Sequence, residues 1–378
     1  MKRRAFLAVL AATLAGAGVW KLLGRSRPSH AGPGGFRLET VASGLDHPWS
    51  FAFLPDGRML VTEREGRLRV VSADGALSSP VEGLPEVSAV GQGGLLDVVL
   101  HPQFSSNRLV YMSFSEPRDG GNATSVMRGT LSEDTRRLEG VEVIFRQQPA
   151  FDGGHHFGSR LVFDRAGALF VTTGDRNRLR DLVQQTDNHI GKIIRITDDG
   201  GIPEDNPKPE GWLPEIWSVG HRNIQGATLH PDTGEYWTVE HGSRGGDELN
   251  RPQGGRNYGW PVISYGKEYS GGQIGEGTAK DGMEQPVHYW DPSIAPSGMV
   301  FYTGDKYPDW QSDLFVGALV QKHVARLTLE GGKVVNEERL FDGEARFRDV
   351  RQGPDGYLYL LTDEGAPDGR VLRVVSAD

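Results

Sequence analysis

Short apolar runs recur along the chain, and each is joined to the next by a tight turn. In "FAFLPDGRMLVTEREGRLRVV", residues 51–71, an apolar run leads into Pro-Asp-Gly and then into a second run rich in Leu and Val. The same layout returns in residues 98–115, 161–175, 227–242, 310–329 and 350–365. An apolar run, a turn and a second apolar run are together typical of a β-hairpin, so we expect six hairpin units.

The spacing of these units predicts the architecture. They return at irregular intervals of about 45 to 80 residues, which suits four-stranded units that carry insertions of different length. Six such units predict an all-β fold, a six-bladed β-propeller of four-stranded antiparallel blades, over residues 36–378. Residues 36–49 would supply a strand that closes the ring with the strand at 369–376. Two packed β-sandwich domains are the competing architecture, but no shift in composition divides residues 36–378.

Composition agrees with a chain of many strands and turns. The 378 residues include 52 Gly and 22 Pro, which are scattered between the apolar runs as turn residues are. Cysteine is absent, so disulfides and thiolate metal sites are excluded. Any metal must therefore be held by other ligands, chiefly oxygen.

The N-terminus predicts where the protein is located. "MKRRAFLAVLAATLAGAGVW" has a basic start, an apolar run and a step of small residues, which together indicate an export signal over residues 1–30. Its Arg3-Arg4 pair resembles a twin-arginine signal. We expect a periplasmic or otherwise extracytoplasmic protein, whether the signal is cleaved or kept as a membrane anchor. The chain's net charge of −9 becomes −15 without the six basic residues of this segment, which disfavours nucleic acid as a partner.

Polar clusters stand where predicted strands give way to loops. They occupy residues 91–102, 153–161, 220–226, 240–250, 254–261 and 346–356. In combination, "GHRNIQG", "EHGSRGGDELN" with "NYGWP", and "RFRDV" resemble the soluble quinoprotein sugar dehydrogenases, the glucose/sorbosone dehydrogenase-like family that includes the PQQ-dependent aldose sugar dehydrogenases. The resemblance covers residues 36–378. It implies a six-bladed propeller that uses pyrroloquinoline quinone (PQQ) and Ca²⁺ to oxidise the C1 hydroxyl of aldoses to lactones.

Two adjacent histidines in "FDGGHHFGSRL" are candidates for the catalytic base. Oxidation by hydride transfer needs a base for the hydroxyl proton, and a neutral imidazole suits that task. The resemblance places the base four residues before an Arg-Leu step, which here is Arg160-Leu161 and selects His156. His155 then stands where the glucose-type members have an acidic residue, which leaves His156 without an obvious carboxylate neighbour. We expect a structural role for His155.

Arginines are the candidates for binding the cofactor, because PQQ carries three carboxylates and an ortho-quinone. The resemblance implies that Arg222 and Asn223 contact the quinone, with Arg222 also stabilising the charge that develops during catalysis. Arg346 and Arg348 alternate along a predicted strand, so both would point to one face and could bind carboxylates. The alternative for this pair is a solvated strand that is ion-paired with Asp349 and nearby acids.

Further cofactor contacts are implied at three other places. Gln92 matches a glutamine near the sugar and the cofactor, and Tyr269 is a candidate wall of the site. A lysine that pairs with the quinone in the family aligns with Val320 of this chain. Lys322 lies two residues later and would point to the same side of an extended strand, so it is the candidate replacement.

Oxygen-rich loops are the candidates for binding calcium. The carbonyls of Gly242 and Ser243 match the positions that bind the cofactor's Ca²⁺, which would polarise the quinone as a Lewis acid. Glu248 and the carbonyl of Tyr258 match a second, structural calcium site. The alternative is that Asp247 and Glu248 only cap a turn.

The sequence therefore favours an enzyme that passes electrons from an aldose sugar to an external acceptor, as a monomer or a homodimer. Two other functions remain open at this point. A calcium-dependent lactonase on the same fold would hold its metal with side-chain carboxylates and Asn at the channel mouth. A non-catalytic carbohydrate-binding propeller would account for the fold and the calcium, but not for the combination of His156, Arg222, Arg346 and Arg348.

Overall fold

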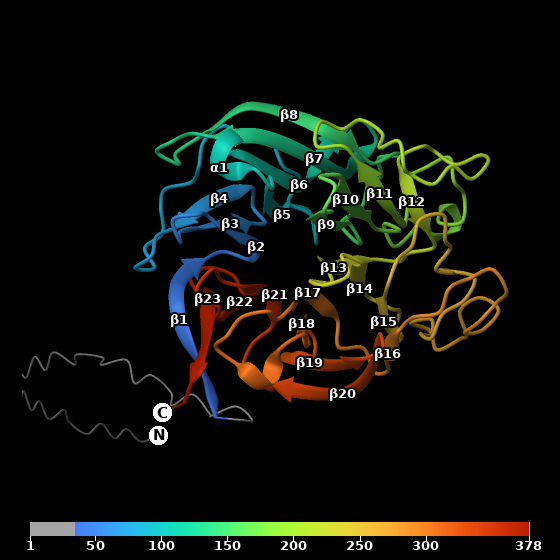
Figure 1. The fold of residues 1–378 in the computed structure, drawn as a ribbon. Helices are drawn as coiled ribbons and strands as arrows, with labels where there is room; N and C mark the ends of the chain where they lie inside the picture. Colours follow the sequence, from blue (N-terminus) through green and yellow to red (C-terminus); the bar gives the residue numbers. More distant parts are fainter. Residues whose placement is uncertain (1–34, 378) are drawn as a thin grey trace, which may run out of the picture. The chain divides into compact units, whose positions relative to one another are not determined.

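The computed structural model describes residues 35–377, which form six antiparallel β-sheets arranged as blades around a central channel (Figure 1). The predicted export signal at residues 1–30 lies outside this range. No helix within the described range is long and apolar enough to span a bilayer. The prediction of an all-β, six-bladed propeller is confirmed, and the alternative of two sandwich domains is wrong.

The first three blades follow one another in sequence. Blade 1 contains β2 (Pro48–Phe53), β3 (Met59–Glu63) and β4 (Arg67–Val71). Blade 2 contains β5 (Leu95–Leu100), β6 (Leu109–Arg118), β7 (Gly121–Leu131) and β8 (Leu138–Arg146), with the short helix α1 (Phe104–Asn107) before β6. Blade 3 contains β9 (Gly158–Phe163), β10 (Leu169–Thr173), β11 (Lys192–Ile196) and β12 (Ile216–Val219), with the 3-10 turn η1 (Arg180–Leu182) before β11.

The last three blades complete the ring. Blade 4 contains β13 (Ile224–Leu229), β14 (Tyr236–Glu240), β15 (Asp247–Asn250) and β16 (His288–Trp290). Blade 5 contains β17 (Pro296–Phe301), β18 (Leu314–Ala318), β19 (His323–Glu330) and β20 (Lys333–Leu340), with η2 (Pro308–Trp310) before β18. Blade 6 contains β21 (Phe347–Gln352), β22 (Leu358–Thr362), β23 (Gly369–Ser376) and β1 (Phe36–Leu45).

Blade 1 differs from the other five in having three strands instead of four. The segment after β4 makes only isolated bridges, between Val71 and Leu77 and between Glu82 and Arg137. Pro80 and Pro85 interrupt this segment, and proline has no N–H to donate to a strand ladder.

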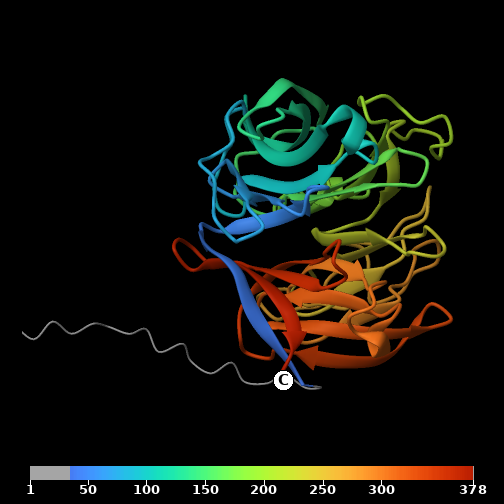
Figure 2. The same ribbon diagram turned by 60° about the vertical axis from the view of Figure 1, so that its left-hand side comes forward.

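The chain closes its ring by pairing its first strand with its last. β1 runs antiparallel to β23, from Phe36 opposite Ser376 to Leu45 opposite Gly369. Figure 2 shows the blue and red strands lying side by side. The predicted closure is therefore confirmed, and it ties the two ends of the propeller into one sheet.

The first strand of each blade lies nearest the channel. These inner strands, β2, β5, β9, β13, β17 and β21, each begin with four buried residues, and each contacts the next around the ring. Apolar side chains fill the space between blades, as where Leu60 of β3 and Met112 of β6 join one buried cluster. Because each blade buries its apolar faces against two neighbours, the core is distributed around the ring rather than placed at its centre.

The channel itself contains a largely buried group of four charged residues and one serine, which we call the axial ion-pair network: Ser50, Asp97, Arg160, Asp349 and Arg351. Arg160 lies 3.1 Å from Asp349 and 3.5 Å from Asp97. Arg351 lies 2.9 Å from Asp349 and 3.1 Å from Asp97, and the Ser50 hydroxyl donates to Asp97 at 2.6 Å. Asp97, Arg160 and Asp349 are each at most 1% exposed. The network joins the inner strands of blades 1, 2, 3 and 6.

Candidate active site

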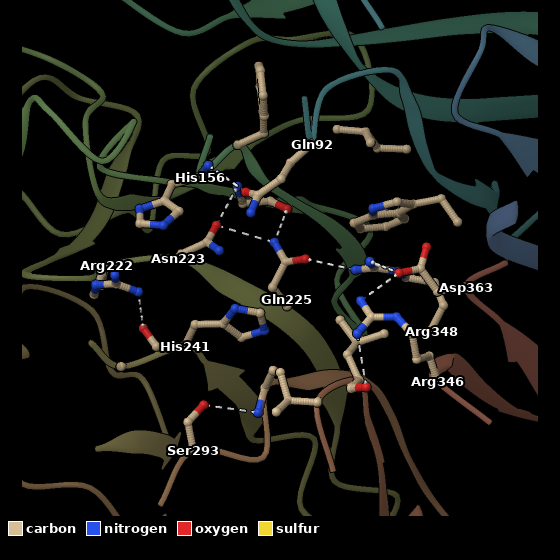
Figure 3. Close-up of a pocket in the computed structure, with 18 of the residues that line it drawn as sticks. Gln92, His156, Arg222, Asn223, Gln225, His241, Ser293, Arg346, Arg348 and Asp363 are labelled. Atoms are coloured by element: carbon tan, nitrogen blue, oxygen red, sulfur yellow. Dashed lines mark hydrogen bonds and ion pairs between the residues drawn. The ribbon is translucent and has the colours of Figure 1, made fainter. Parts of the chain in front are cut away.

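A cavity of about 650 Å³ opens where the chain enters the inner strands (Figure 3). Every blade contributes to its lining. The contributing positions lie just before or at the start of the six inner strands: His47 and Trp49, Gln92 and Leu96, His156 to Gly158, Arg222, Asn223 and Gln225, Ser293 and Ala295, and Arg346 and Arg348. Because the inner strands run in the same direction, these positions gather at one end of the channel.

His156 lies in this lining just before β9, and its side chain is firmly held. Its Nδ1 is 2.6 Å from Asp175 Oδ1, and its backbone N–H donates to Gln92 Oε1 at 2.9 Å. The residue is 7% exposed and has a φ of 52°, in the left-handed region. That conformation costs about 1–2 kcal/mol in a residue with a Cβ, so the surrounding contacts must hold it in place. His155 is exposed and is not among the lining residues.

Asp175 is the carboxylate partner that the sequence did not identify for His156. The β9–β10 hairpin pairs Gly158 with Thr173, so Asp175, two residues beyond the strand, falls beside His156. Its second oxygen accepts a hydrogen bond from Trp260 Nε1 at 2.9 Å. The expectation that His156 lacks such a partner is wrong. The predicted hairpin at 161–175 already ends at Asp175, but only continuing its first strand back to His156 would have shown the pair.

The environment of His156 favours its neutral form. Burial lowers its pKa, the hydrogen bond to Asp175 opposes that effect, and the charge of Arg222 lowers the pKa further. Burial alone would raise the pKa of Asp175, but the hydrogen bond from His156 keeps that pKa below its usual value. With a carboxylate at Nδ1, the neutral ring carries its proton there and leaves Nε2 as an acceptor. His156 can therefore accept a proton from a bound ligand.

Arg222 and Asn223 enter the cavity just before β13. The Arg222 backbone N–H donates to Glu240 at 2.6 Å, and its Nη1 donates to the His241 carbonyl at 3.1 Å. Its guanidinium lies 5.3 Å from the centre of the Trp260 ring and forms no ion pair with a carboxylate of residues 35–377. Asn223 Oδ1 accepts from the Gly158 N–H at 3.2 Å. A buried guanidinium without a carboxylate suits an anionic ligand.

Arg346 and Arg348 both line the cavity, as their alternation predicts, and they share one acid. Their Nη2 atoms lie 3.0 and 2.9 Å from the same oxygen of Asp363. Burial would raise the pKa of Asp363, but the charges of Arg348 and Arg346 lower it to about 2. Asp349 belongs instead to the axial ion-pair network. Asp363 was not identified from the sequence, because this residue follows a different strand, β22. The pairing of β21 with β22 brings it to the arginines, and its N–H donates to the Arg346 carbonyl at 2.8 Å.

The cavity is strongly cationic although the chain as a whole is acidic. Five arginines line it together with a single carboxylate: Arg64, Arg222, Arg244, Arg346, Arg348 and Asp363. Figure 3 shows His156 and Arg222 on one side of the view and the Arg346–Asp363–Arg348 group on the other. The lining therefore suits a ligand with several negative charges. Arg64 and Arg244 were not identified from the sequence.

The other predicted cofactor contacts divide into two groups. Gln92 and Tyr269 line the cavity, and Tyr269 is 70% exposed. Val320 also lines it, with 62% exposure, whereas Lys322 is exposed and is not part of the lining. The extended strand expected through 320–322 is wrong. These residues form the turn between β18 and β19, where Lys322 has a φ of 52°, so strand alternation does not bring Lys322 to the side of Val320.

The predicted cofactor-calcium carbonyls also differ in position. Gly242 lines the cavity, and its carbonyl accepts no hydrogen bond from the part of the chain that the structure describes. Ser243 is 3% exposed, lies outside the lining, and accepts the Lys267 N–H at 2.8 Å. Gly242 thus has a carbonyl available for a cation at the cavity, whereas the Ser243 carbonyl already has one partner.

The second predicted calcium site lies beside a small cavity of about 10 Å³, large enough for one water or ion. Glu240, Glu248 and Tyr258 line it. The Asn250 amide donates to both glutamates, at 3.3 and 3.1 Å, and burial followed by the charge of Glu240 raises the pKa of Glu248 to about 8. The Tyr258 carbonyl accepts no hydrogen bond within the described residues. Two neighbouring carboxylates and a vacant carbonyl suit a divalent cation, and Glu240 is a candidate ligand that the sequence did not reveal.

Known proteins share this fold and much of this sequence. The sequence profile of the family described as Glucose / Sorbosone dehydrogenase matches residues 45–373. The aldose sugar dehydrogenase YliI of Escherichia coli (strain K12) is 49% identical over 351 residues, which cover 91% of this chain and 94% of that protein. A crystal structure of a glucose dehydrogenase has a TM-score of 0.87 and 52% identity, covering 90% of this chain and 99% of that one.

A further solved structure is that of a protein with a bound cofactor. It is the PQQ-bound form of aldose sugar dehydrogenase from Streptomyces coelicolor, with a TM-score of 0.76 and 29% identity over 91% of this chain and 99% of that one. Sequence and fold agree over nearly all of the described residues. The chain therefore belongs to the glucose/sorbosone dehydrogenase family of oxidoreductases.

Proposed function

We propose that this protein oxidises aldose sugars at the C1 hydroxyl to the lactone, using PQQ and Ca²⁺, and passes the electrons to an external acceptor. The observation that carries the proposal is the combination of a buried imidazole, held by Asp175, with a cationic cavity at the channel end. The relative described as PQQ-bound supports the choice of cofactor.

The residues present fit a planar tricarboxylate. Five arginines against one carboxylate leave a net positive lining, and about 650 Å³ is within the usual range for small-molecule sites. Arg222, Asn223, Arg346 and Arg348 would hold the cofactor, with Gln92 and Tyr269 beside it. When bound, the quinone would supply the acceptor for the C1 hydride.

The chain's own groups would carry the rest of the reaction. His156 Nε2 accepts the proton of the C1 hydroxyl as the hydride leaves C1, so the cyclic hemiacetal form of the sugar loses two electrons and two hydrogens and becomes the lactone. Asp175 holds the imidazole at Nδ1 and stabilises the imidazolium that results. Arg222 stabilises negative charge that develops in the cavity, where burial strengthens the interaction.

Two places would hold Ca²⁺. The Gly242 carbonyl, with Ser243 beside it, would bind the ion of the cofactor site, and Glu248 with the Tyr258 carbonyl and Glu240 would bind the structural ion. No group of three or more His, Cys, Asp or Glu side chains within residues 35–377 is arranged to hold a metal. Carbonyl and water oxygens would therefore complete both ligand sets, with cofactor oxygens contributing only at the cofactor site.

The cavity gives little support to the other two functions. A calcium-dependent lactonase would need carboxylates free to bind metal at the channel mouth, and the one carboxylate in the lining is engaged by Arg346 and Arg348. A carbohydrate-binding propeller would not require a base held by a buried carboxylate. We further propose export to the periplasm, on the basis of the signal predicted at residues 1–30.

Cofactor reconstitution tests the function. Protein prepared without cofactor should be inactive, should gain a quinone absorption band when PQQ and Ca²⁺ are added, and should then reduce an artificial dye in the presence of aldoses. PQQ and Ca²⁺ should each tighten the binding of the other and raise the melting temperature. Each component added alone is the control. No absorption change and no dye reduction with a panel of mono- and disaccharides would refute the dehydrogenase proposal.

Substitutions at Val320 and Lys322 test which side chain can add charge to the site. Because Val320 lines the cavity and Lys322 does not, Val320→Lys should tighten PQQ binding by roughly 1.5 to 3 kcal/mol, the value of one charge-assisted contact. Lys322→Ala should leave the PQQ affinity unchanged. Absorbance titration measures both. The reverse pattern, a loss on Lys322→Ala with no gain on Val320→Lys, would contradict the arrangement of this turn.

A further inference from the structure

Arg176 directly follows Asp175 in the sequence, and its side chain donates hydrogen bonds to the loop that carries His156. It is 1% exposed, and its guanidinium forms no ion pair with any carboxylate of the described residues. Its Nε donates to the His155 carbonyl at 3.0 Å, and its Nη2 donates to the Gly153 carbonyl. The guanidinium also lies 3.9 Å from the centre of the Phe157 ring. Three of its contacts thus fall on the short loop at 153–157.

The same guanidinium fastens this loop to a neighbouring blade. Nη1 donates to the Asn122 carbonyl at 3.0 Å and Nη2 to the Asn122 side-chain oxygen at 2.7 Å. Asn122 belongs to β7 of blade 2 and forms an isolated bridge with Phe151, just before the loop. Arg176 therefore holds the loop against a strand whose place is set by a four-stranded sheet.

The backbone conformation explains how the consecutive residues Asp175 and Arg176 can both contact His156 or its loop. In an extended strand, neighbouring side chains point to opposite faces. Here Arg176 and Asn177 have φ values of 54° and 63°, so the chain turns sharply after Asp175. Asp175 then binds the His156 ring, while Arg176 binds the backbone carbonyls of His155 and Gly153 in the loop before it. His156 itself is left-handed, a conformation that persists where the surroundings over-determine it.

We propose that Arg176 is a positioning residue for the catalytic base. It is not part of the cavity lining, so it touches neither substrate nor cofactor and acts only through the backbone at Gly153 and His155. By holding these two carbonyls it keeps the imidazole of His156 in register with Asp175 and with the cavity. The inference rests on the proposed role of His156 as the base.

The test compares Arg176→Met and Arg176→Lys with Arg195→Met as a matched control. Arg195 is 4% exposed, lies on β11 of the same blade and is paired with Asp164 and Asp205 away from the cavity. Its loss should lower the melting temperature without affecting catalysis.

Two readouts separate positioning from general stability. In cofactor-free protein, the downfield NMR signal of the His156 Nδ1 proton, assigned by its absence in His156→Asn, reports the contact with Asp175. In reconstituted protein, kcat and KM for an aldose and the affinity for PQQ are measured. Arg176→Met should broaden or remove the signal and lower kcat by about 10-fold to 10²-fold, with KM and PQQ affinity nearly unchanged. Arg176→Lys, which keeps the charge and some donors, should recover part of both.

The proposal is overturned if Arg176→Met lowers only the melting temperature, or if Arg195→Met lowers kcat and weakens the signal equally. Should Arg176→Met fail to fold, Arg176→Lys decides the matter. A folded lysine variant with wild-type signal and kcat would refute the role, and partial loss of both would support it. Because the NMR readout needs no cofactor, it decides the positioning role even if PQQ does not bind, an outcome that reconstitution of the wild type would reveal separately.

Discussion

His156→Asn is expected to lower kcat by about 10²-fold to 10⁴-fold while leaving PQQ binding nearly intact. In the proposed mechanism the imidazole acts on the substrate proton, whereas arginines would hold the cofactor. Asparagine keeps a polar side chain at the position but cannot accept the proton at neutral pH. Steady-state rates of the reconstituted enzyme, together with a PQQ titration, measure the two effects separately.

His155→Asn is the matched control for this prediction. His155 is adjacent in sequence but exposed and outside the cavity lining, so its loss should change kcat little. If His155→Asn abolished turnover and His156→Asn did not, the assignment of the base would be wrong.

The pH dependence supplies an independent check on the same residue. Because burial lowers the pKa of His156, the neutral base should persist below the ordinary histidine value of 6.5. The value of kcat/KM should therefore be constant near neutrality and fall only when the pH drops through the lowered pKa, since the imidazolium cannot accept a proton. An acid limb centred above 6.5 would contradict the burial of this side chain.

Asp97→Asn is expected to lower the free energy of unfolding by about 3–5 kcal/mol. Asp97 accepts hydrogen bonds from the Ser50 hydroxyl at 2.6 Å, the Leu161 N–H at 2.8 Å and Arg351 Nη2 at 3.1 Å, and it lies 3.5 Å from Arg160. Asparagine would leave the two guanidiniums with one fewer negative charge and turn an NH₂ group toward donors. Denaturant unfolding of the cofactor-free protein measures the loss.

The controls for this prediction are a surface acid and a neutral member of the same network. Asp134→Asn removes a carboxylate that is 61% exposed and 3.9 Å from Arg136, and it should leave stability nearly unchanged. Ser50→Ala removes one hydrogen bond to Asp97 without removing charge, so its cost should be clearly smaller than that of Asp97→Asn. If Asp97→Asn were as stable as Asp134→Asn, the axial ion-pair network would not hold the blades together.

Much of the fold could be predicted from the sequence because its units are local. A β-hairpin needs two apolar runs and a turn, all within about 20 residues, and six such units leave little choice but a closed ring. The pairing of β1 with β23 could be predicted because both strands lie outside the six hairpin units and need a partner. Strand alternation predicted that Arg346 and Arg348 share one face, and the family resemblance selected His156 by its distance from Arg160-Leu161.

The rest of the site depends on which separate segments the tertiary structure places together. Asp175 reaches His156, and Asp363 reaches Arg346, through the registers of hairpins whose ends the apolar pattern does not define. Arg64 and Arg244 come from blades 1 and 4, and no local motif marks either as facing the cavity. Lys322 was expected in an extended strand, but it lies in a turn. Strand alternation therefore does not predict the direction of its side chain. Hydrophobic periodicity records which residues are buried against a sheet, but the neighbours of a charged side chain at a strand end are decided by hairpin register and by the packing of one blade on the next.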